Sequence, residues 1–124
     1  MSSAKSLLSI IELGGYPDLS PIYKKHGYEP IVVYSMRKAL NALKKAKPEV
    51  VVAEFNYQSD FRDRTSSLES LIAIAQQNAD MKLIVFYEKE YAHQFEKLQA
   101  RYTFHSTFMY PIDESLIDHV LSDL

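Results

Sequence analysis

The sequence predicts an α/β domain built on a doubly wound parallel sheet of five strands, with helices on both faces. Apolar, β-prone segments alternate along its 124 residues with segments of helical periodicity, a pattern that requires parallel strands joined by right-handed crossovers. Three of the apolar segments are nearly continuous in apolar residues, which is typical of strands buried on both faces. The natural strand order for such a sheet in a chain of this size is 2-1-3-4-5.

Five segments are expected to form the strands. The nearly continuous ones are Pro30–Tyr34, Val50–Phe55 and Lys82–Tyr87, and the other two are Leu7–Leu13 and Thr103–Met109. We find no linker, internal repeat or low-complexity stretch between them. One domain is therefore expected to span residues 1–124.

Helix signals occupy the intervals between these strands. Ser35 is expected to cap the second helix, and Pro48 follows its end. Ser66 and Glu69 form the capping-box pattern of the third helix, and Asp113 is placed to cap the last.

The first helix and one long loop are less regular. Pro17 and Pro21 both fall near the start of that helix, where proline is tolerated only in the first turn, and Gly27 has the position of a left-handed C-cap. The long segment Asn56–Thr65 is expected to be irregular. It follows the third strand, at the carboxyl edge where doubly wound sheets place their binding sites.

Composition excludes several classes of protein. The absence of cysteine excludes disulfides and thiolate-based metal or catalytic sites, and three glycines are too few for a dinucleotide fingerprint or a P-loop. The sequence contains neither an apolar run of membrane-spanning length nor a signal-peptide core, so we expect a cytoplasmic protein without membrane contact. The histidines show no metal-ligand spacing, and no cofactor is expected.

A basic cluster in the second predicted helix raises the question of nucleic-acid binding, because such clusters neutralise phosphates. The simpler interpretation is the solvated face of an amphipathic helix. The net charge of −2 favours that interpretation, so nucleic acid is not the expected partner. The cluster comprises Arg37, Lys38, Lys44, Lys45 and Lys47.

The stretch from Gly27 to Glu54, GYEPIVVYSMRKALNALKKAKPEVVVAE, resembles the receiver domains of response regulators. In both, a glycine precedes the second strand, an Ala-Leu pair lies in the next helix, and Pro-Asp or Pro-Glu precedes an apolar third strand that ends in an acid. Tyr110-Pro111 is similar to the Lys-Pro that follows the family's fifth strand. The resemblance covers essentially the whole chain and implies a flavodoxin-like, CheY-like fold.

The resemblance also implies where phosphoryl transfer would occur. A working receiver phosphorylates a short aspartate, holds Mg²⁺ with acids after the first strand, and binds the phosphoryl oxygens with a hydroxyl and a lysine. The matching positions form a degenerate phosphoacceptor pocket of Glu12, Leu13, Glu54, Asn56, Tyr87 and Tyr110.

Each side-chain requirement is altered in this pocket. Glu54 is one methylene longer than the nucleophile, and Leu13 stands in place of a metal-holding acid. Tyr87 replaces the small hydroxyl residue, and Tyr110 replaces the lysine. Asn56 could still present a backbone carbonyl to a metal. The resemblance therefore implies a pseudo-receiver that is not phosphorylated in the usual manner, with no catalytic residue and no bound metal.

Two functions are compatible with this sequence. The first is a non-catalytic signalling or adaptor module that acts through protein contacts, with Tyr87 and Tyr110 filling the former phosphate pocket. The alternative is a phosphorylation-independent regulator that binds a small ligand or metal at the carboxyl edge, for which Glu54, Asp60 and Asp63 offer oxygen ligands. Local salt bridges with neighbouring arginines are the simpler explanation of the last two acids.

Aromatic residues crowd into the last third of the chain, and aromatics favour interfaces when they reach the surface. Two interpretations stay open. The residues could form an apolar patch that a symmetric homodimer would bury, or they could be core residues of a monomer. The candidate interface residues are Tyr91, Phe95, Tyr102, Phe108 and Tyr110.

Overall fold

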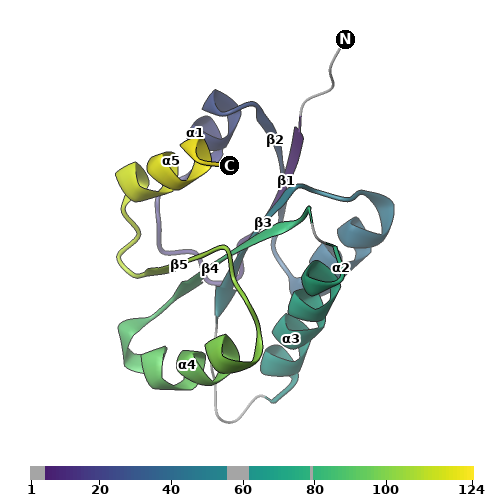
Figure 1. The fold of residues 1–124 in the computed structure, drawn as a ribbon, viewed down its shortest axis with the longest axis vertical. Coiled ribbons are helices and arrows are strands. Elements are labelled where there is room, and N and C mark those ends of the chain that lie inside the picture. The colour runs from purple at the N-terminus through teal and green to yellow at the C-terminus, as the bar shows by residue number, and fades with distance from the viewer. Residues whose placement is uncertain (1–4, 56–61, 79) are drawn as a thin grey trace.

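A computed structural model of the chain describes residues 5–55, 62–78 and 80–124, with backbone alone for residues 62–67 (Figure 1). Five parallel strands form one sheet in the order β2-β1-β3-β4-β5, which confirms the predicted architecture. The strands are β1 (Lys5–Ile10), β2 (Tyr28–Val33), β3 (Val50–Phe55), β4 (Lys82–Tyr87) and β5 (Ser106–Met109). The helices are α1 (Ser20–Lys25), α2 (Met36–Lys45), α3 (Arg62–Gln76), the 3₁₀ turn η1 (Lys89–Tyr91), α4 (Ala92–Arg101) and α5 (Glu114–Ser122).

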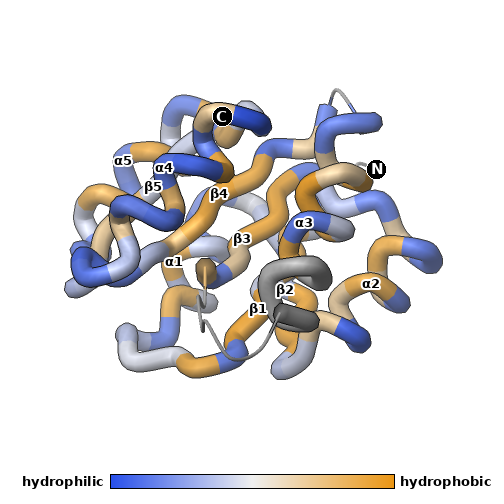
Figure 2. Tube along the Cα trace, turned by 90° about the horizontal axis from the view of Figure 1, so that it is seen from below, coloured by the Kyte–Doolittle hydropathy of each residue, from blue (hydrophilic) through white to orange (hydrophobic). Residues whose placement is uncertain are grey.

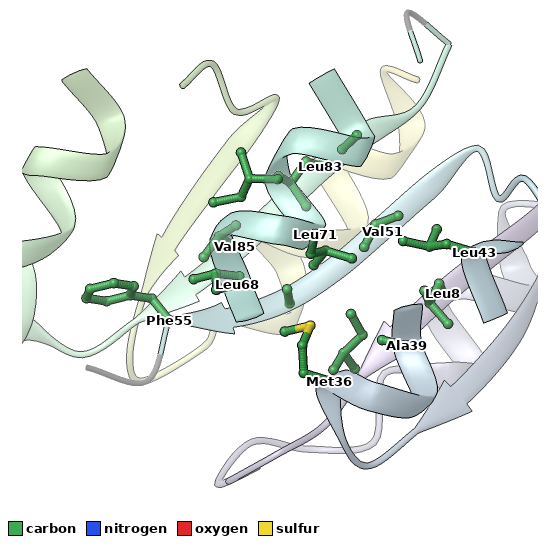
Figure 3. Close-up of a cluster of buried hydrophobic side chains, with 14 of the residues drawn as sticks. Leu8, Met36, Ala39, Leu43, Val51, Phe55, Leu68, Leu71, Leu83 and Val85 are labelled. Carbon is green, nitrogen blue, oxygen red and sulfur yellow. The ribbon is translucent and has the colours of Figure 1, made fainter. Parts of the chain in front are cut away.

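The sheet separates two hydrophobic cores. Helices α1 and α5 lie on one face, and α2, α3 and α4 cover the other (Figure 1). The larger α2/α3/α4 core includes Leu8, Ala39, Val51, Leu71 and Val85, whose side chains meet between the strands and the helices (Figure 3). The α1/α5 core includes Leu7, Tyr23, Val52, Phe86 and Ile117.

Strand side chains alternate between these two cores because successive residues of a strand point to opposite faces. In β3, Val50 and Val52 belong to the α1/α5 core, whereas Val51 and Phe55 belong to the other. β3 is buried along its entire length, and Figure 2 shows the central strands β3 and β4 as largely hydrophobic segments. This double burial explains their nearly unbroken apolar sequences.

Several local signals are confirmed. The Ser35 hydroxyl accepts a hydrogen bond from the Lys38 N–H, and the Asp113 carboxylate accepts one from the Ser115 N–H, so both residues cap their helices. Gly27 follows α1 with φ of 87°, a left-handed conformation that favours glycine. In α2, Met36, Ala39 and Leu43 are buried while the basic residues are exposed, which agrees with a solvated amphipathic face.

Other expectations were wrong at the element boundaries. β1 ends at Ile10 rather than Leu13, because the chain turns after it toward two glycines of positive φ. β5 begins at Ser106 rather than Thr103. α3 begins at Arg62, so the last part of the expected irregular segment Asn56–Thr65 is helical and Ser66 is not its cap. Neither glycine nor proline occurs between Arg62 and Ser66, so nothing in the sequence stops the helix from extending. Residues 56–61 lie outside the described residues.

Within the described part of the chain, none of the helices is both long enough and apolar enough to cross a membrane.

Candidate functional site at the carboxyl edge

Glu54 is the centre of the candidate site. It lies near the carboxyl end of β3, on the face that α1 and α5 cover, and only 1% of it is exposed. Its carboxylate accepts hydrogen bonds from the backbone N–H groups of Leu13 (2.8 Å), Gly14 (3.2 Å) and Glu12 (3.3 Å), and from the Tyr16 hydroxyl (2.9 Å). We call this arrangement the Glu54 clamp. It fastens the β1–α1 loop to β3.

Three successive N–H groups of the loop point to the Glu54 carboxylate, which is the arrangement that backbone uses to bind an anion. Here the anion belongs to the chain itself. The last of these donors is the first of two adjacent glycines. Gly14 and Gly15 have φ of 71° and 83°, the left-handed region that other residues rarely adopt, and the chain turns there before Tyr16 donates to the same carboxylate.

The register of the sheet brings Glu54 to this loop. Ser9 of β1 pairs with Val52 of β3, so Glu54, two positions further along, lies level with the chain just after β1 ends. A carboxylate that is removed from water is costly unless hydrogen bonds replace its hydration. The four donors of the clamp supply that replacement, and charge-assisted bonds of this kind each contribute about 1.5–3 kcal/mol.

Tyr16 completes the clamp from the side of α1. Burial and the adjacent Glu54 carboxylate both raise the pKa of its hydroxyl far above the ordinary value, so the hydroxyl remains a neutral donor. The ring of Tyr16 packs edge-on against Phe86, with ring centres 5.1 Å apart, and against Tyr110 at 6.0 Å. This aromatic group holds the hydroxyl in place.

Tyr110 lies beside the clamp. Its hydroxyl donates to the carbonyl oxygen of Gly14 at 3.2 Å, and burial, reinforced by Glu54, raises its pKa well above the ordinary range. A neutral phenol therefore occupies the position where the receiver resemblance implies a lysine. It supplies no positive charge to an incoming phosphoryl group.

The predicted pocket residues come together only in part. Glu12 and Leu13 bond to Glu54 through their backbone, and the Leu13 side chain is largely exposed. The expectation that Tyr87 fills the same pocket was wrong, because Tyr87 points to the opposite face of the sheet and stacks on Phe95 with ring centres 4.6 Å apart. The alternation of side chains along β4 causes this separation.

Other candidate ligands cannot be placed. Asn56, Asp60 and the side chain of Asp63 lie outside the described residues. Among the residues that the structure does describe, no group of three or more histidine, aspartate or glutamate side chains is placed to hold a metal ion.

Sequence reasoning missed Tyr16 and the role of Gly14. Two adjacent glycines are typical of a sharp turn, and both have positive φ here. Consecutive glycines in the loop after a first strand are also a signal for an anion-binding loop. The identity of the anion, a glutamate from β3, depends on a contact across 40 or more residues.

The candidate interface also needs correction. Phe95 is fully buried, and its ring packs against Phe104 and Phe55. It cannot contribute to a surface patch. Tyr91 and Tyr102 pack partly buried against the α2/α3/α4 core, whereas Phe108 and Tyr110 pack against the α1/α5 core. The five aromatics are therefore divided between the two faces of the sheet.

Exposed apolar residues mark the carboxyl edge instead. In the described part of the chain, four large hydrophobic residues are between 44% and 68% exposed. They are Leu13 and Tyr34, which follow β1 and β2, Met109 at the end of β5, and Leu116 in the first turn of α5.

Comparisons with known proteins identify the fold. No family model matches the sequence, and no curated protein matches it. Among solved structures, a response regulator receiver domain protein from Clostridium thermocellum superposes with a TM-score of 0.72 over 96% of this chain and 92% of that one, at 11% identity. The chain has the receiver fold. The chemotaxis protein CheY4 of Vibrio cholerae gives the same TM-score at 13% identity over 98% of both chains. A sensor protein from Polaromonas gives 0.69 at 19% identity, over 95% of this chain and 94% of that one.

Proposed function

We propose that this receiver-like domain is a non-catalytic signalling or adaptor module that acts through protein contacts without phosphoryl transfer. The Glu54 clamp is the observation that carries the proposal. A nucleophilic carboxylate must present an oxygen to the incoming phosphorus atom. Glu54 is buried, and its oxygens accept bonds from four donors of the β1–α1 loop.

The surroundings of Glu54 support the same conclusion. Phosphoryl transfer requires positive charge or metal to balance the charge that develops on the phosphoryl oxygens. Tyr110 is neutral and bonds to the Gly14 carbonyl, and Leu13 offers no carboxylate. Tyr87, on the opposite face, supplies no hydroxyl to the site.

The clamp also favours a permanent binding surface over a switch. In place of a transient modification, a carboxylate that belongs to the chain holds the loop in one arrangement. The exposed Leu13 lies on that loop, at the same edge as Met109 and Leu116. Exposed apolar side chains are a feature of interaction sites.

Charge at this edge indicates the kind of partner. Asp113 caps α5 and Glu114 is its first residue, two positions before Leu116, and Glu12 directly precedes Leu13. A partner that presents apolar side chains with a basic rim would complement this surface.

Phosphodonor treatment tests the absence of phosphoryl transfer. The chain is incubated with phosphoramidate and Mg²⁺, and its intact mass is measured. We expect no increase of one phosphoryl group for the wild type or for Glu54→Asp, because the shorter acid still lacks a cation and a metal-holding partner. An acyl-phosphate adduct at the substituted position of the Glu54→Asp variant would contradict the proposal.

A comparison of edge variants tests the protein contacts. The proteins that bind to the wild-type chain are compared with those that bind to the double variant Leu13→Ser/Leu116→Ser. Lys47→Ser, at the opposite edge of the sheet, is the control. The proposal expects one or more proteins whose binding is lost in the edge variant and retained in the control. Identical recovery by all three chains would contradict contact at this edge.

A further inference from the structure

A cavity of about 340 Å³ lies on the α1 side of the sheet, next to the Glu54 clamp. It exists because α1 begins late. Pro17 lies in the irregular segment that leads to the helix, and Pro21 occupies its first turn, so helical structure starts only at Ser20. The carboxyl-side parts of β1 and β2 consequently lack helical cover on this face. The volume falls within the range of about 300–1,000 Å³ that small-molecule sites occupy.

The inner part of the cavity is neutral. Its polar side chains, Ser9 and Tyr23, are almost fully buried. Burial raises the pKa of Tyr23, which keeps the phenol uncharged. The cavity is also lined by the apolar side chains of Ile11, Val32 and Leu19. This interior suits the hydrocarbon or aromatic body of a ligand rather than a charged group.

The mouth of the cavity has the opposite character. Asp18 is exposed, and hydrogen bonds from Ser20, including a backbone N–H bond of 3.0 Å, lower the pKa of its carboxyl group. Asp18 therefore carries negative charge at neutral pH. Tyr34 is 68% exposed and presents an aromatic ring at the same cavity. A carboxylate and an accessible aromatic face are both groups that attract an organic cation.

We infer that this cavity is a binding site for a small organic amine, with its cationic group at Asp18 and Tyr34 and its apolar body against Ile11, Val32 and Leu19. The inference goes beyond the proposed function, because the cavity lies on the β1–β2–α1 side and does not require a protein partner. An anionic ligand of the same shape would meet the Asp18 carboxylate at the mouth and is disfavoured.

The cavity and the clamp share part of the β1–α1 loop. Gly14 and Tyr16 line the cavity, while the Gly14 N–H and the Tyr16 hydroxyl bond to Glu54. A bound amine therefore contacts the same loop that carries the exposed Leu13. Occupation of the cavity is expected to stabilise the loop in its clamped arrangement.

Titration of the full chain with matched probes tests the site. The probes are 2-phenylethylamine, its neutral analogue 2-phenylethanol and its anionic analogue phenylacetate, followed by amide chemical shifts in ¹H–¹⁵N spectra. We expect saturable shifts with the amine that centre on Ser9, Val32 and Tyr34, with weaker binding of the alcohol and weakest binding of the acid.

Two variants separate charge from aromatic contact. Asp18→Asn retains an oxygen that can accept from Ser20, so the start of α1 is preserved while the charge is removed. It should weaken amine binding about fivefold and leave alcohol binding unchanged. Tyr34→Ala, at an exposed position, should weaken both, and Asp80→Asn at the opposite edge should change neither.

Several outcomes would overturn the inference. They are the absence of saturable binding by the amine, equal binding of amine and acid, or an Asp18→Asn variant that binds the amine as the wild type does. None of these outcomes affects the phosphodonor or edge-variant experiments, so the cavity and the proposed function can fail independently.

Discussion

The carboxylate of Glu54 accepts a 2.8 Å hydrogen bond from the backbone N–H of Leu13, which lies 41 residues earlier in the chain. In the receiver resemblance these positions correspond to a nucleophile and to a metal-holding acid, which a metal ion would connect. Here they are joined directly. The bond uses the backbone of Leu13, whose side chain is exposed, so the Glu54 carboxylate itself fastens the loop after β1 to β3.

Removal of the Glu54 charge should destabilise the domain. Glu54→Gln keeps the shape but replaces one accepting oxygen with an NH₂ donor that faces N–H groups. We expect a loss of about 3 kcal/mol in the free energy of unfolding, measured with urea. The control Glu49→Gln removes an exposed carboxylate 3.9 Å from Lys5 and should cost less than about 0.5 kcal/mol. Equal effects of the two changes would contradict a structural role for the clamp.

Tyr16→Phe isolates one bond of the clamp. The ring and its packing against Phe86 remain, while the hydroxyl that donates to Glu54 at 2.9 Å is lost. The expected cost is about 1–2 kcal/mol, the usual range for a bond to a charged acceptor. Tyr34→Phe is the matched control, because that side chain is exposed and its hydroxyl is not part of the clamp. In the Glu54→Gln background, Tyr16→Phe should cost measurably less, and strict additivity would argue against direct coupling.

Phe95 should behave as a core residue and not as an interface residue. Phe95→Ala is expected to lower stability by about 3–5 kcal/mol, because the ring is fully buried and stacks on Tyr87 and Phe104. Phe95→Leu is the milder variant if the alanine variant does not fold. Neither folded variant should change the sedimentation coefficient beyond what unfolding explains. A shift from dimer to monomer on either change would restore Phe95 to an interface.

Sedimentation tests whether the chain self-associates through the α4–β5–α5 face, which the sequence leaves open. Tyr91, Tyr102 and Phe108 are partly buried within the domain, which leaves Met109 as the large apolar side chain most exposed on β5. We expect a monomer of 14.3 kDa at micromolar concentrations, since the apolar area that Met109 exposes is small for a stable dimer. A dimer that Met109→Ser dissociates would establish the alternative.

Acidification should weaken the contact between α1 and α5. Asp118 on α5 bonds to His26 and Lys25 at the end of α1, and these partners lower the pKa of its carboxyl below the ordinary value of 3.8. A depressed pKa in the folded state stabilises the fold above the unfolded value, and this contribution is lost as the pH falls through the folded value. Asp118→Asn should therefore reduce the steepness with which the urea midpoint falls below about pH 4. The control Asp123→Asn, at the exposed end of α5, should leave that slope nearly unchanged.

Local patterns in the sequence were sufficient for the architecture. The near-continuous apolar character of Val50–Phe55 and Lys82–Tyr87 predicts their central, doubly covered positions, and β3 and β4 have these bounds in the structure. The caps at Ser35 and Asp113 were equally readable, because a capping bond joins residues two or three positions apart. Such signals depend on backbone geometry that neighbouring residues control, and they need no knowledge of distant contacts.

The candidate site depended on contacts that no local pattern encodes. Tyr87 and Tyr110 looked equivalent in the sequence, yet strand alternation sends Tyr87 to Phe95 on one face while Tyr110 reaches Gly14 on the other. Glu54 looked like an altered nucleophile, and its partners became evident only when sheet register placed it beside the loop after β1. The pairing of a buried carboxylate with N–H groups some 40 residues away follows from how the strands align and how the chain turns after β1. That alignment is a property of the folded chain, because burial makes an unpaired carboxylate costly and so selects the arrangement in which every oxygen finds a donor.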